Sequence, residues 1–245
     1  MTDGTTSTAR PKGRPVPDWR APPCPGPDVM QGRHARLERL APHHAPALHH
    51  AFSADDAVWD YLPYGPFDTL EGQADWVARM ADGEDPYFYA IHDLSRPEAG
   101  ALGVASYLRI APAAGSVEVG HINFAPALQR TVAATEAMAL MMGWAFDAGY
   151  RRYEWKCDAL NAGSRQAAQR LGFSFEGVFR QAAVIKGRNR DTAWFAACDG
   201  DWPALREAFD RWLSPGNFDA EGRQRASLVT FTAPVRVASD PEQGG

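Results

Sequence analysis

Apolar and polar residues alternate in several stretches of the chain, and this alternation predicts a β-sheet. A period of two residues is that of a strand with one buried face. It recurs in residues 33–40, 87–92, 101–110 and 116–124. The last three stretches follow one another closely, with turn residues between them, so they predict an antiparallel meander.

The pattern changes after Pro126, which has no N–H to donate to a neighbouring strand. Helix-forming Ala, Leu and Met residues then fill residues 131–146, and a strand at 151–157 and a short helix at 164–171 follow. Strand–helix–strand connections join parallel strands. We therefore expect the strand before Pro126 and the strand at 151–157 to run parallel and to separate just past Phe124.

The rest of the chain completes an α/β (α+β) pattern. Residues 175–198 predict a final hairpin, residues 201–213 a helix with one apolar face, and residues 228–234 either an edge strand or a packed tail. Together these elements indicate a mixed, mostly antiparallel central sheet of about seven strands, flanked by helices and containing one splayed parallel pair.

Three regions are expected along the chain. Residues 1–30 form an arm rich in proline, which excludes helix and central strand, so we expect an extended or disordered segment. Trp19 is the one residue in it that could anchor the arm to the surface. Residues 31–213 form the domain, and residues 214–245 are a C-terminal extension.

Composition and charge narrow the possible partners. Of the 245 residues, 45% are hydrophobic, which is enough for a core, and the net charge of −5 without a basic stripe argues against nucleic acid. No apolar run is long enough to cross a membrane, and no signal-peptide pattern is present. The three cysteines form no C-x-x-C pair, which favours a reducing compartment. We therefore expect a cytoplasmic protein without nucleic-acid or membrane partners.

Four histidines, His43, His44, His49 and His50, lie on the helix expected after Pro42. They lack a clean i, i+4 pair, and no carboxylate or cysteine accompanies them in the sequence. We expect solvated helix residues and no metal site.

The stretch from Gln129 to Thr135 joins a strand to the long helix and is the first candidate binding site. Thr131 is the expected N-cap of that helix. A loop that leads into a helix N-terminus presents free backbone N–H groups and the positive end of the helix dipole, which suit an anion such as pyrophosphate. Arg130 adds a side-chain charge at the same place.

The second motif is Asn161-Ala162-Gly163-Ser164, which one short helix separates from Leu171-Gly172-Phe173. Together the two motifs resemble the GNAT superfamily of acetyl-CoA-dependent N-acetyltransferases, over roughly residues 36–212. The resemblance is greatest to the RimJ/RimL branch, whose loops commonly run into A-T-E-A, as residues 134–137 do. The K-G-R-x-R-D-T hairpin at residues 186–192 also suits that branch.

The resemblance implies that acetyl-CoA is the cosubstrate and that its pantetheine lies between the splayed strands, paired with the exposed backbone of the first. It implies a set of binding residues: Phe124, Gln129, Arg130, Thr131, Ala133, Ala134, Thr135, Asn161 and Ser164. Val132 stands where the family loop has glycine, and valine disfavours a positive φ. We expect the N–H groups there to be held in plain helical geometry, with weakened cofactor binding as the alternative.

Acetyl transfer to an amine needs a base for the amine, donors for the carbonyl oxygen and an acid for the departing thiolate. The resemblance implies a base on the strand at 116–124, where Glu118 and His121 are the candidates. Their opposite side-chain parity lets at most one of them face the acceptor, and we choose Glu118. Ser164 is the candidate acid, with helix capping as its other role. Backbone N–H near Phe124 would hold the oxyanion.

The aromatic loop at residues 58–67 is the expected acceptor side, although its rings also suit a core. We expect Trp59, Tyr61 and Tyr64, with His121, to bind the acceptor, which is either a protein N-terminal α-amine or a small amine. The leading interpretation is an N-acetyltransferase that works by direct attack in a ternary complex. The alternatives are a non-catalytic acyl-CoA-binding or sensing module and a structural dimer subunit, and a homodimer stays open.

Overall fold

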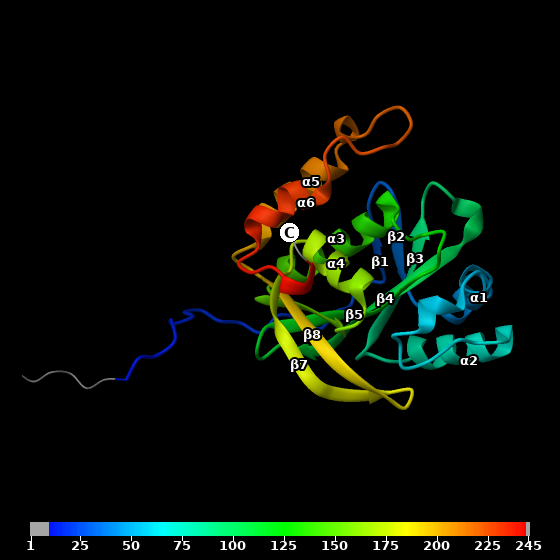
Figure 1. The fold of residues 1–245 in the computed structure, drawn as a ribbon, viewed down its shortest axis with the longest axis horizontal. Coiled ribbons are helices and arrows are strands. Elements are labelled where there is room, and N and C mark those ends of the chain that lie inside the picture. Colours follow the sequence, from blue (N-terminus) through cyan, green and yellow to red (C-terminus); the bar gives the residue numbers. More distant parts are fainter. Residues whose placement is uncertain (1–9, 244–245) are drawn as a thin grey trace, which may run out of the picture.

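A mixed eight-stranded sheet forms the centre of the protein (Figure 1), in a computed structural model that describes residues 10–243. The strand order is β1-β2-β3-β4-β5-β6-β8-β7, and every neighbouring pair is antiparallel except β5 and β6. The strands are β1 (Val29–Gln31), β2 (Ala35–Arg39), β3 (Tyr87–Asp93), β4 (Ala101–Ala111), β5 (Ser116–Phe124), β6 (Arg152–Asp158), β7 (Ser174–Ile185) and β8 (Arg188–Cys198). The predicted fold class is confirmed, and the strand that the sequence pattern did not reveal is β1, at the sheet edge.

Helices cover both faces of this sheet. They are α1 (Ala45–Phe52), α2 (Leu70–Ala81), α3 (Val132–Asp147), α4 (Ala162–Arg170), α5 (Trp202–Leu213) and α6 (Leu228–Thr232). Figure 1 shows α1 and α2 beside β3 and β4, and the β7–β8 hairpin (yellow) projecting from the other end of the sheet. No helix among residues 10–243 combines the length and the apolarity that a bilayer crossing requires.

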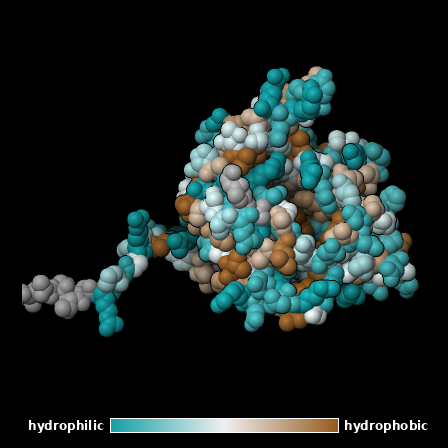
Figure 2. Space-filling model, in the orientation of Figure 1, coloured by the Kyte–Doolittle hydropathy of each residue, from teal (hydrophilic) through white to brown (hydrophobic). Residues whose placement is uncertain are grey.

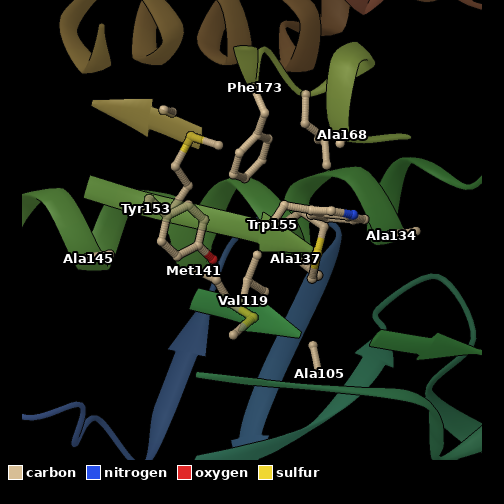
Figure 3. Close-up of a cluster of buried hydrophobic side chains, with 14 of the residues drawn as sticks. Ala105, Val119, Ala134, Ala137, Met141, Ala145, Tyr153, Trp155, Ala168 and Phe173 are labelled. Carbon is tan, nitrogen blue, oxygen red and sulfur yellow. The ribbon is translucent and has the colours of Figure 1, made fainter. Parts of the chain in front are cut away.

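Two apolar layers hold these helices on the sheet. Odd-numbered strand residues such as Leu37 and Tyr107 join the core under α3, whereas even-numbered residues such as Phe88 and Val104 pack beneath α1 and α2. Figure 3 shows part of the larger core, where Trp155 and its neighbours on β6 meet the side chains of α3. Because alternate strand residues point to opposite faces, the same strands supply both layers.

The two parallel strands, β5 and β6, pair only over their first residues. Their register runs from Ser116 opposite Arg152 to Val119 opposite Trp155. The separation therefore begins well before Phe124, not just past it as predicted. Beyond Val119, β5 keeps β4 as its neighbour on one side and faces an open gap on the other.

A β-bulge interrupts β5 next to this gap. The register with β4 shifts between the pair Ser106–Gly120 and the pair Val104–Asn123, and His121 inside the shift has φ 50°. A bulge of this kind adds a residue to one strand and changes the direction in which the following side chains point.

Side chains cap both helices that follow the gap. Thr131 Oγ1 accepts the N–H of Ala134 at 3.0 Å, which confirms Thr131 as the N-cap of α3. Asn161 Oδ1 accepts the N–H of Ser164 at 3.0 Å and caps α4. The capping role considered for Ser164 is therefore wrong, because α4 begins at Ala162 and Ser164 lies within its first turn.

The segment after α5 packs against the domain. Residues 228–234 pack as a tail, in the form of the short helix α6, whose Leu228 joins the larger core. Farther on, buried Asp240 accepts two hydrogen bonds from Arg165 of α4, at 2.6 Å from Nε and 2.5 Å from Nη2. Gln169 Oε1 accepts the N–H of Asp240 at 2.8 Å. These bonds fix the end of the described chain to α4.

The proline-rich arm lies partly on the domain, and its first nine residues fall outside the described part of the chain. Trp19 packs on Gly115, where an added Cβ would lie 2.3 Å from the indole ring, so the predicted anchor is confirmed. The carbonyls of Pro23 and Pro27 each accept a tyrosine hydroxyl at 2.9 Å. Figure 2 shows the part of the arm near residue 10 leaving the body, with a largely hydrophilic surface.

Candidate active site

A cavity of about 1350 Å³ reaches both sides of the gap between β5 and β6. One part, here called the helix end, is lined by the first turn of α3, by α4 and by several residues of the segment 212–229. The other part, here called the hairpin end, is lined by β4, by residues 57–63 and by the β7–β8 hairpin. Because the gap connects the two ends, a ligand in one can meet a ligand in the other there.

The N-terminus of α3 gives the helix end an anion-binding arrangement. No hydrogen-bond partner is found within residues 10–243 for the N–H groups of Arg130, Val132 and Ala133. Val132 is the first residue of α3 and has no positive φ, whereas Arg130 before it has φ 61°. The prediction of plain helical geometry is therefore confirmed for the N–H groups of Val132 and Ala133, but not for that of Arg130. Free N–H groups and the helix dipole together favour an anion.

Arg170 of α4 brings a further positive charge to the helix end. Its Nη1 donates to Thr135 Oγ1 at 3.0 Å, and its guanidinium carbon lies 5.1 Å from the centroid of the Trp212 ring. No salt-bridge partner is found for it in the described chain, and burial alone lowers the pKa of Arg170. A partly buried cation without a counter-ion, beside a helix N-terminus, suits a phosphate group.

The outer wall of the helix end comes from the segment after α5. Trp212, Phe218, Gln224 and Val229 line the cavity there. Trp212 Nε1 donates to Gln224 Oε1 at 2.8 Å, which fixes two parts of this wall to each other. Sequence analysis gave these residues no binding role, because no motif marks them and only the folded extension brings them to the cavity.

Most of the predicted cofactor-binding residues are brought together at the helix end and the gap. The residues that line the cavity are Phe124, Gln129, Arg130, Thr131, Ala134, Thr135, Asn161 and Ser164. Ala133 is buried behind them and offers only its N–H.

The end of β5 directs a backbone donor into the gap. Ala125 donates its N–H to the carbonyl of Leu102 in β4 at 3.0 Å. Successive N–H groups of a strand point to opposite sides, so the N–H of Phe124 points away from β4 and into the gap. The carbonyl of Phe124 accepts Gln129 Nε2 at 2.9 Å, which fixes the loop that leads to α3.

Ser164 lies beside the gap with its hydroxyl proton free to donate. Its Oγ accepts the indole N–H of Trp155 at 3.0 Å, and Ser164 acts to lower the pKa of the Cys157 thiol. Burial, the larger effect, raises the pKa of Cys157 to about 11, so this thiol is protonated near neutral pH and is a poor nucleophile.

Glu118 is buried at the hairpin end and held by two cations. Its Oε2 lies 2.6 Å from Arg109 Nη1 and 2.8 Å from Lys156 Nζ. Lys156 also bonds Glu154 at 2.7 Å. The carboxylate is thus fixed in position at the cavity wall and is not an ordinary exposed strand residue.

His121 lines the same cavity as Glu118, so the opposite side-chain parity from which we expected at most one of them to face the acceptor does not hold. The bulge at His121 breaks the strand parity on which that prediction depended. Its Nδ1 lies 2.9 Å from the hydroxyl of Tyr64. Burial, followed by the charges of Arg109 and Arg190, lowers the pKa of His121 to about 4, so the ring is neutral at pH 7.

The aromatic loop divides between cavity and core. Tyr61 lines the cavity and donates its hydroxyl to the carbonyl of Leu160 at 3.3 Å. Trp59 is 2% exposed and packs in the core beneath α1 and α2, so its ring does not line the cavity as predicted. Tyr64 does not line the cavity itself but contacts His121, which does. The two rings stack with 5.6 Å between their centroids.

Sequence analysis gave no role to several side chains that line the hairpin end, among them Arg109, Lys156, Phe179, Arg190 and Trp194. Lys156 Nζ lies 3.8 Å from the centroid of the Trp194 ring, and the rings of Trp194 and Phe179 have centroids 4.5 Å apart. Strand parity could have placed Lys156 beside Glu118. Phe179, Arg190 and Trp194 reach the cavity only in the folded hairpin. Arg109 reaches it with a backbone φ of 47°, which the sequence does not reveal.

A separate group of potential metal ligands lies under α1. Glu38, His44 and His92 place ligand atoms within 4.8 Å of one another, and His44 is buried. The prediction of solvated helix histidines without a carboxylate neighbour is therefore wrong for His44. Its Nδ1 accepts the N–H of Ala41 at 3.0 Å, so Nε2 carries the proton and cannot ligate a metal in this tautomer.

The chain was compared with protein-family models and with solved structures, and both comparisons found acetyltransferases. The family model described as "Acetyltransferase (GNAT) domain" matches residues 34–174. The chain is 41% identical to a GCN5-related N-acetyltransferase from Brucella melitensis; the match covers 89% of this chain and 100% of that one, with a TM-score of 0.86. It is also 41% identical to a probable GNAT-family acetyltransferase from Chromobacterium violaceum, with 80% and 98% covered and a TM-score of 0.74.

The chain also resembles RimL, the ribosomal L7/L12 α-N-protein acetyltransferase, at 22% identity. That match covers 69% of this chain and 93% of that one, with a TM-score of 0.59. Likeness at this level shows a shared fold, so membership of the RimJ/RimL branch stays a prediction. No curated protein sequence matches the chain.

Proposed function

The chain belongs to the GNAT acetyltransferase family, and on this basis we propose that it is an N-acetyltransferase that moves the acetyl group of acetyl-CoA to a primary amine by direct attack in a ternary complex. The cavity that reaches both sides of the gap between β5 and β6 carries this proposal. It joins an anion-binding helix end to a hairpin end in which a buried carboxylate, Glu118, lies at the wall.

The residues of the helix end fit acetyl-CoA, which supplies the acetyl group as an activated thioester. The free N–H groups of Val132 and Ala133, with Arg130 and Arg170, would hold its phosphates. The backbone of β5 beyond Val119 has no partner strand on the gap side and would pair with the amide groups of the pantetheine.

The proposal assigns three groups around the gap to the steps of acyl transfer. Glu118 takes a proton from the acceptor ammonium, directly or through water, and so frees the nitrogen lone pair. The N–H of Phe124 stabilises the negative charge that develops on the carbonyl oxygen. Ser164 gives its proton to the departing sulfur and is reprotonated from solvent. In the balance, a C–N bond replaces a C–S bond and the nitrogen of the acceptor ammonium loses two protons. One is released to solvent through Glu118, and the other, lost as the tetrahedral intermediate collapses, balances the proton that the sulfur gains.

The alternative of a non-catalytic acyl-CoA-binding module is less well supported. It depended on Val132, which α3 accommodates without a positive φ. Within the family we propose kinship with the RimJ/RimL branch, on the A-T-E-A sequence at residues 134–137 and the hairpin at 186–192. We also propose a cytoplasmic location, from cysteines that are free in the structure.

Calorimetric titration with acetyl-CoA, with desulfo-CoA as a control, tests the helix end first. We expect binding in the micromolar range, and then release of the CoA thiol when amines are added to the complex. Binding without thiol release on any small amine or N-terminal peptide would favour the non-catalytic alternative. Absence of binding would remove the proposal.

A further inference from the structure

One arginine side chain at the hairpin end has no hydrogen-bond or salt-bridge partner among the residues that the structure describes. Arg190 lines the cavity, and its Nε is buried without a hydrogen-bond acceptor. No carboxylate oxygen of residues 10–243 lies within the 4.0 Å of a salt bridge to its guanidinium. The guanidinium group keeps its charge under all ordinary conditions, so a positive charge at this wall is left without an opposite charge.

The charges joined by salt bridges at this wall balance one another. Arg109 and Lys156 share Glu118, Lys156 also bonds Glu154, and Glu154 bonds Arg152. Arg152 in turn bonds Glu176, so the chain of contacts holds equal numbers of cations and carboxylates. Arg190 stands outside it. Asp158, another carboxylate of the cavity wall, accepts the N–H of Leu160 and makes no salt bridge with Arg190.

The charge of Arg190 acts where the acceptor would lie. It is one of the two arginines that lower the pKa of His121, on β5, and it also acts on Cys157, on β6. It therefore lies within electrostatic range of both strands that border the gap. Arg109, the other arginine beside His121, has a side chain that is 62% exposed.

We propose that the acceptor is a small primary amine that also carries an anionic group, a carboxylate in the simplest case, and that Arg190 binds this group. This rests on the proposed function, because it names the class of amine used at the same site. A guanidinium presents a planar fork of N–H donors that matches a carboxylate. A polycationic amine would meet an unpaired cation there and be disfavoured.

Two contacts that span the hairpin end favour a compact acceptor. Lys186 Nζ, near the tip of the β7–β8 hairpin, donates to the carbonyl of Trp59 at 2.9 Å. Tyr61, in the same aromatic loop as Trp59, donates its hydroxyl to the carbonyl of Leu160, between β6 and α4. The rings of Phe179 and Trp194 line the same cavity as Arg190 and offer an apolar surface. An amino acid with an apolar side chain combines all of these features.

The test compares amino acids with their amides, which have the same amine and side chain but no carboxylate. L-Phenylalanine, L-methionine and L-tryptophan, each with its amide, are assayed for CoA-thiol release at saturating acetyl-CoA. We expect kcat/KM to favour the acid by roughly tenfold or more, the size of a charge-assisted hydrogen bond. In Arg190→Gln the preference should fall to within about twofold, while Arg190→Lys should keep part of it.

Arg188→Gln is the matched control, because Arg188 lies on the same strand, is exposed and does not line the cavity. It should keep the full preference. Calorimetric titration of each acid and amide into the protein saturated with desulfo-CoA gives a second readout that needs no turnover.

The outcomes separate this inference from the proposed function. Acids that bind better than amides without thiol release would support the anion site and count against acetyl transfer. Thiol release that is equal or faster with amides, with putrescine, or with a peptide that begins with the same residue would overturn the inference and leave the acetyltransferase standing. A preference that survives in Arg190→Gln, or failure of all acids to bind, would also overturn it.

Discussion

The helix end and the hairpin end of the cavity differ in the kind of group that each offers to a ligand. The helix end offers mainly backbone groups, namely the free N–H groups of α3 and the unpaired edge of β5. The side chains of Arg130 and Arg170 add positive charge to them. The hairpin end offers mainly side chains, among them Glu118 and His121 of β5 and Arg190 of β8.

The difference teaches how each end can change in evolution. A backbone site depends on where a strand ends and a helix begins, and we expect it to tolerate Val132 in place of glycine because N–H groups do not depend on the side chain. A side-chain site changes with one substitution. We therefore expect the helix end to determine the reaction that the family shares, and the hairpin end to determine the acceptor.

The largest effect should come from the groups that handle protons, one at each end. We expect Glu118→Gln and Ser164→Ala each to lower turnover by about 10² to 10⁴, the usual contribution of general acid–base catalysis. Calorimetry should show acetyl-CoA affinity nearly unchanged in Glu118→Gln. Glu154→Gln is the control, since Glu154 shares Lys156 with Glu118 but does not line the cavity. Unchanged turnover at saturating substrates would remove the residue concerned from its role.

The next largest effect should come from Asp240, near the end of the described chain, which bonds Arg165 of α4. Asp240→Asn leaves the buried guanidinium of Arg165 without its main counter-charge, and loss of one partner of a buried pair typically costs about 3 to 5 kcal/mol of unfolding free energy. Urea denaturation measures this change. In Glu242→Gln, which removes an exposed partner of the same arginine, we expect a loss of at most about 1 kcal/mol. Equal losses in the two variants would contradict this.

Acid should weaken the hairpin end through His121. The folded-state pKa, about 4, lies below the ordinary value of 6.5, so the unfolded chain binds the proton more readily. Stability is therefore complete above pH 6.5 and is lost as the pH falls towards 4, by up to roughly 3 kcal/mol from this residue. In His121→Asn the slope of stability against pH in that window should be smaller. An unchanged slope would assign the acid sensitivity elsewhere, for instance to His44, whose pKa burial also lowers to about 4.

The smallest expected effect probes Arg170 alone. In Arg170→Gln we expect acetyl-CoA to bind about tenfold to a hundredfold more weakly, because one charge-assisted contact to phosphate is lost. Binding of S-acetylpantetheine, which has no phosphate, should not change. Arg211→Gln, on the exposed side of α5, is the control. An equal loss for both ligands would place Arg170 outside phosphate binding.

The same contrast explains what could be predicted from the sequence. The strand at 116–124, the cap Thr131 and the α3 and α4 segments follow local rules of period, capping and helix propensity, and they define most of the helix end. Ser164, Asn161 and Arg130 were found because short contiguous motifs contain them.

The residues that were missed or misplaced depend on tertiary structure. The bulge at His121 reverses a side chain that strand parity alone assigns to the other face. Trp59 resembles a pocket residue in sequence but fills the core below α1 and α2, since nothing local distinguishes the two environments. Arg190 and Trp194 reach the cavity only because β8 inserts between β6 and β7 in the sheet.

The bond between Arg165 and Asp240 also constrains the order of events during protein synthesis. Arg165 belongs to α4, but its counter-charge is translated some way later, after α5 and α6. Until Asp240 has left the ribosome, the guanidinium of Arg165 lacks this counter-charge. The hairpin end can assemble from the chain up to Cys198, whereas completion of the helix end waits for nearly the last residues of the described chain. We therefore expect the proposed acetyl-CoA site to be complete only after translation has passed Asp240.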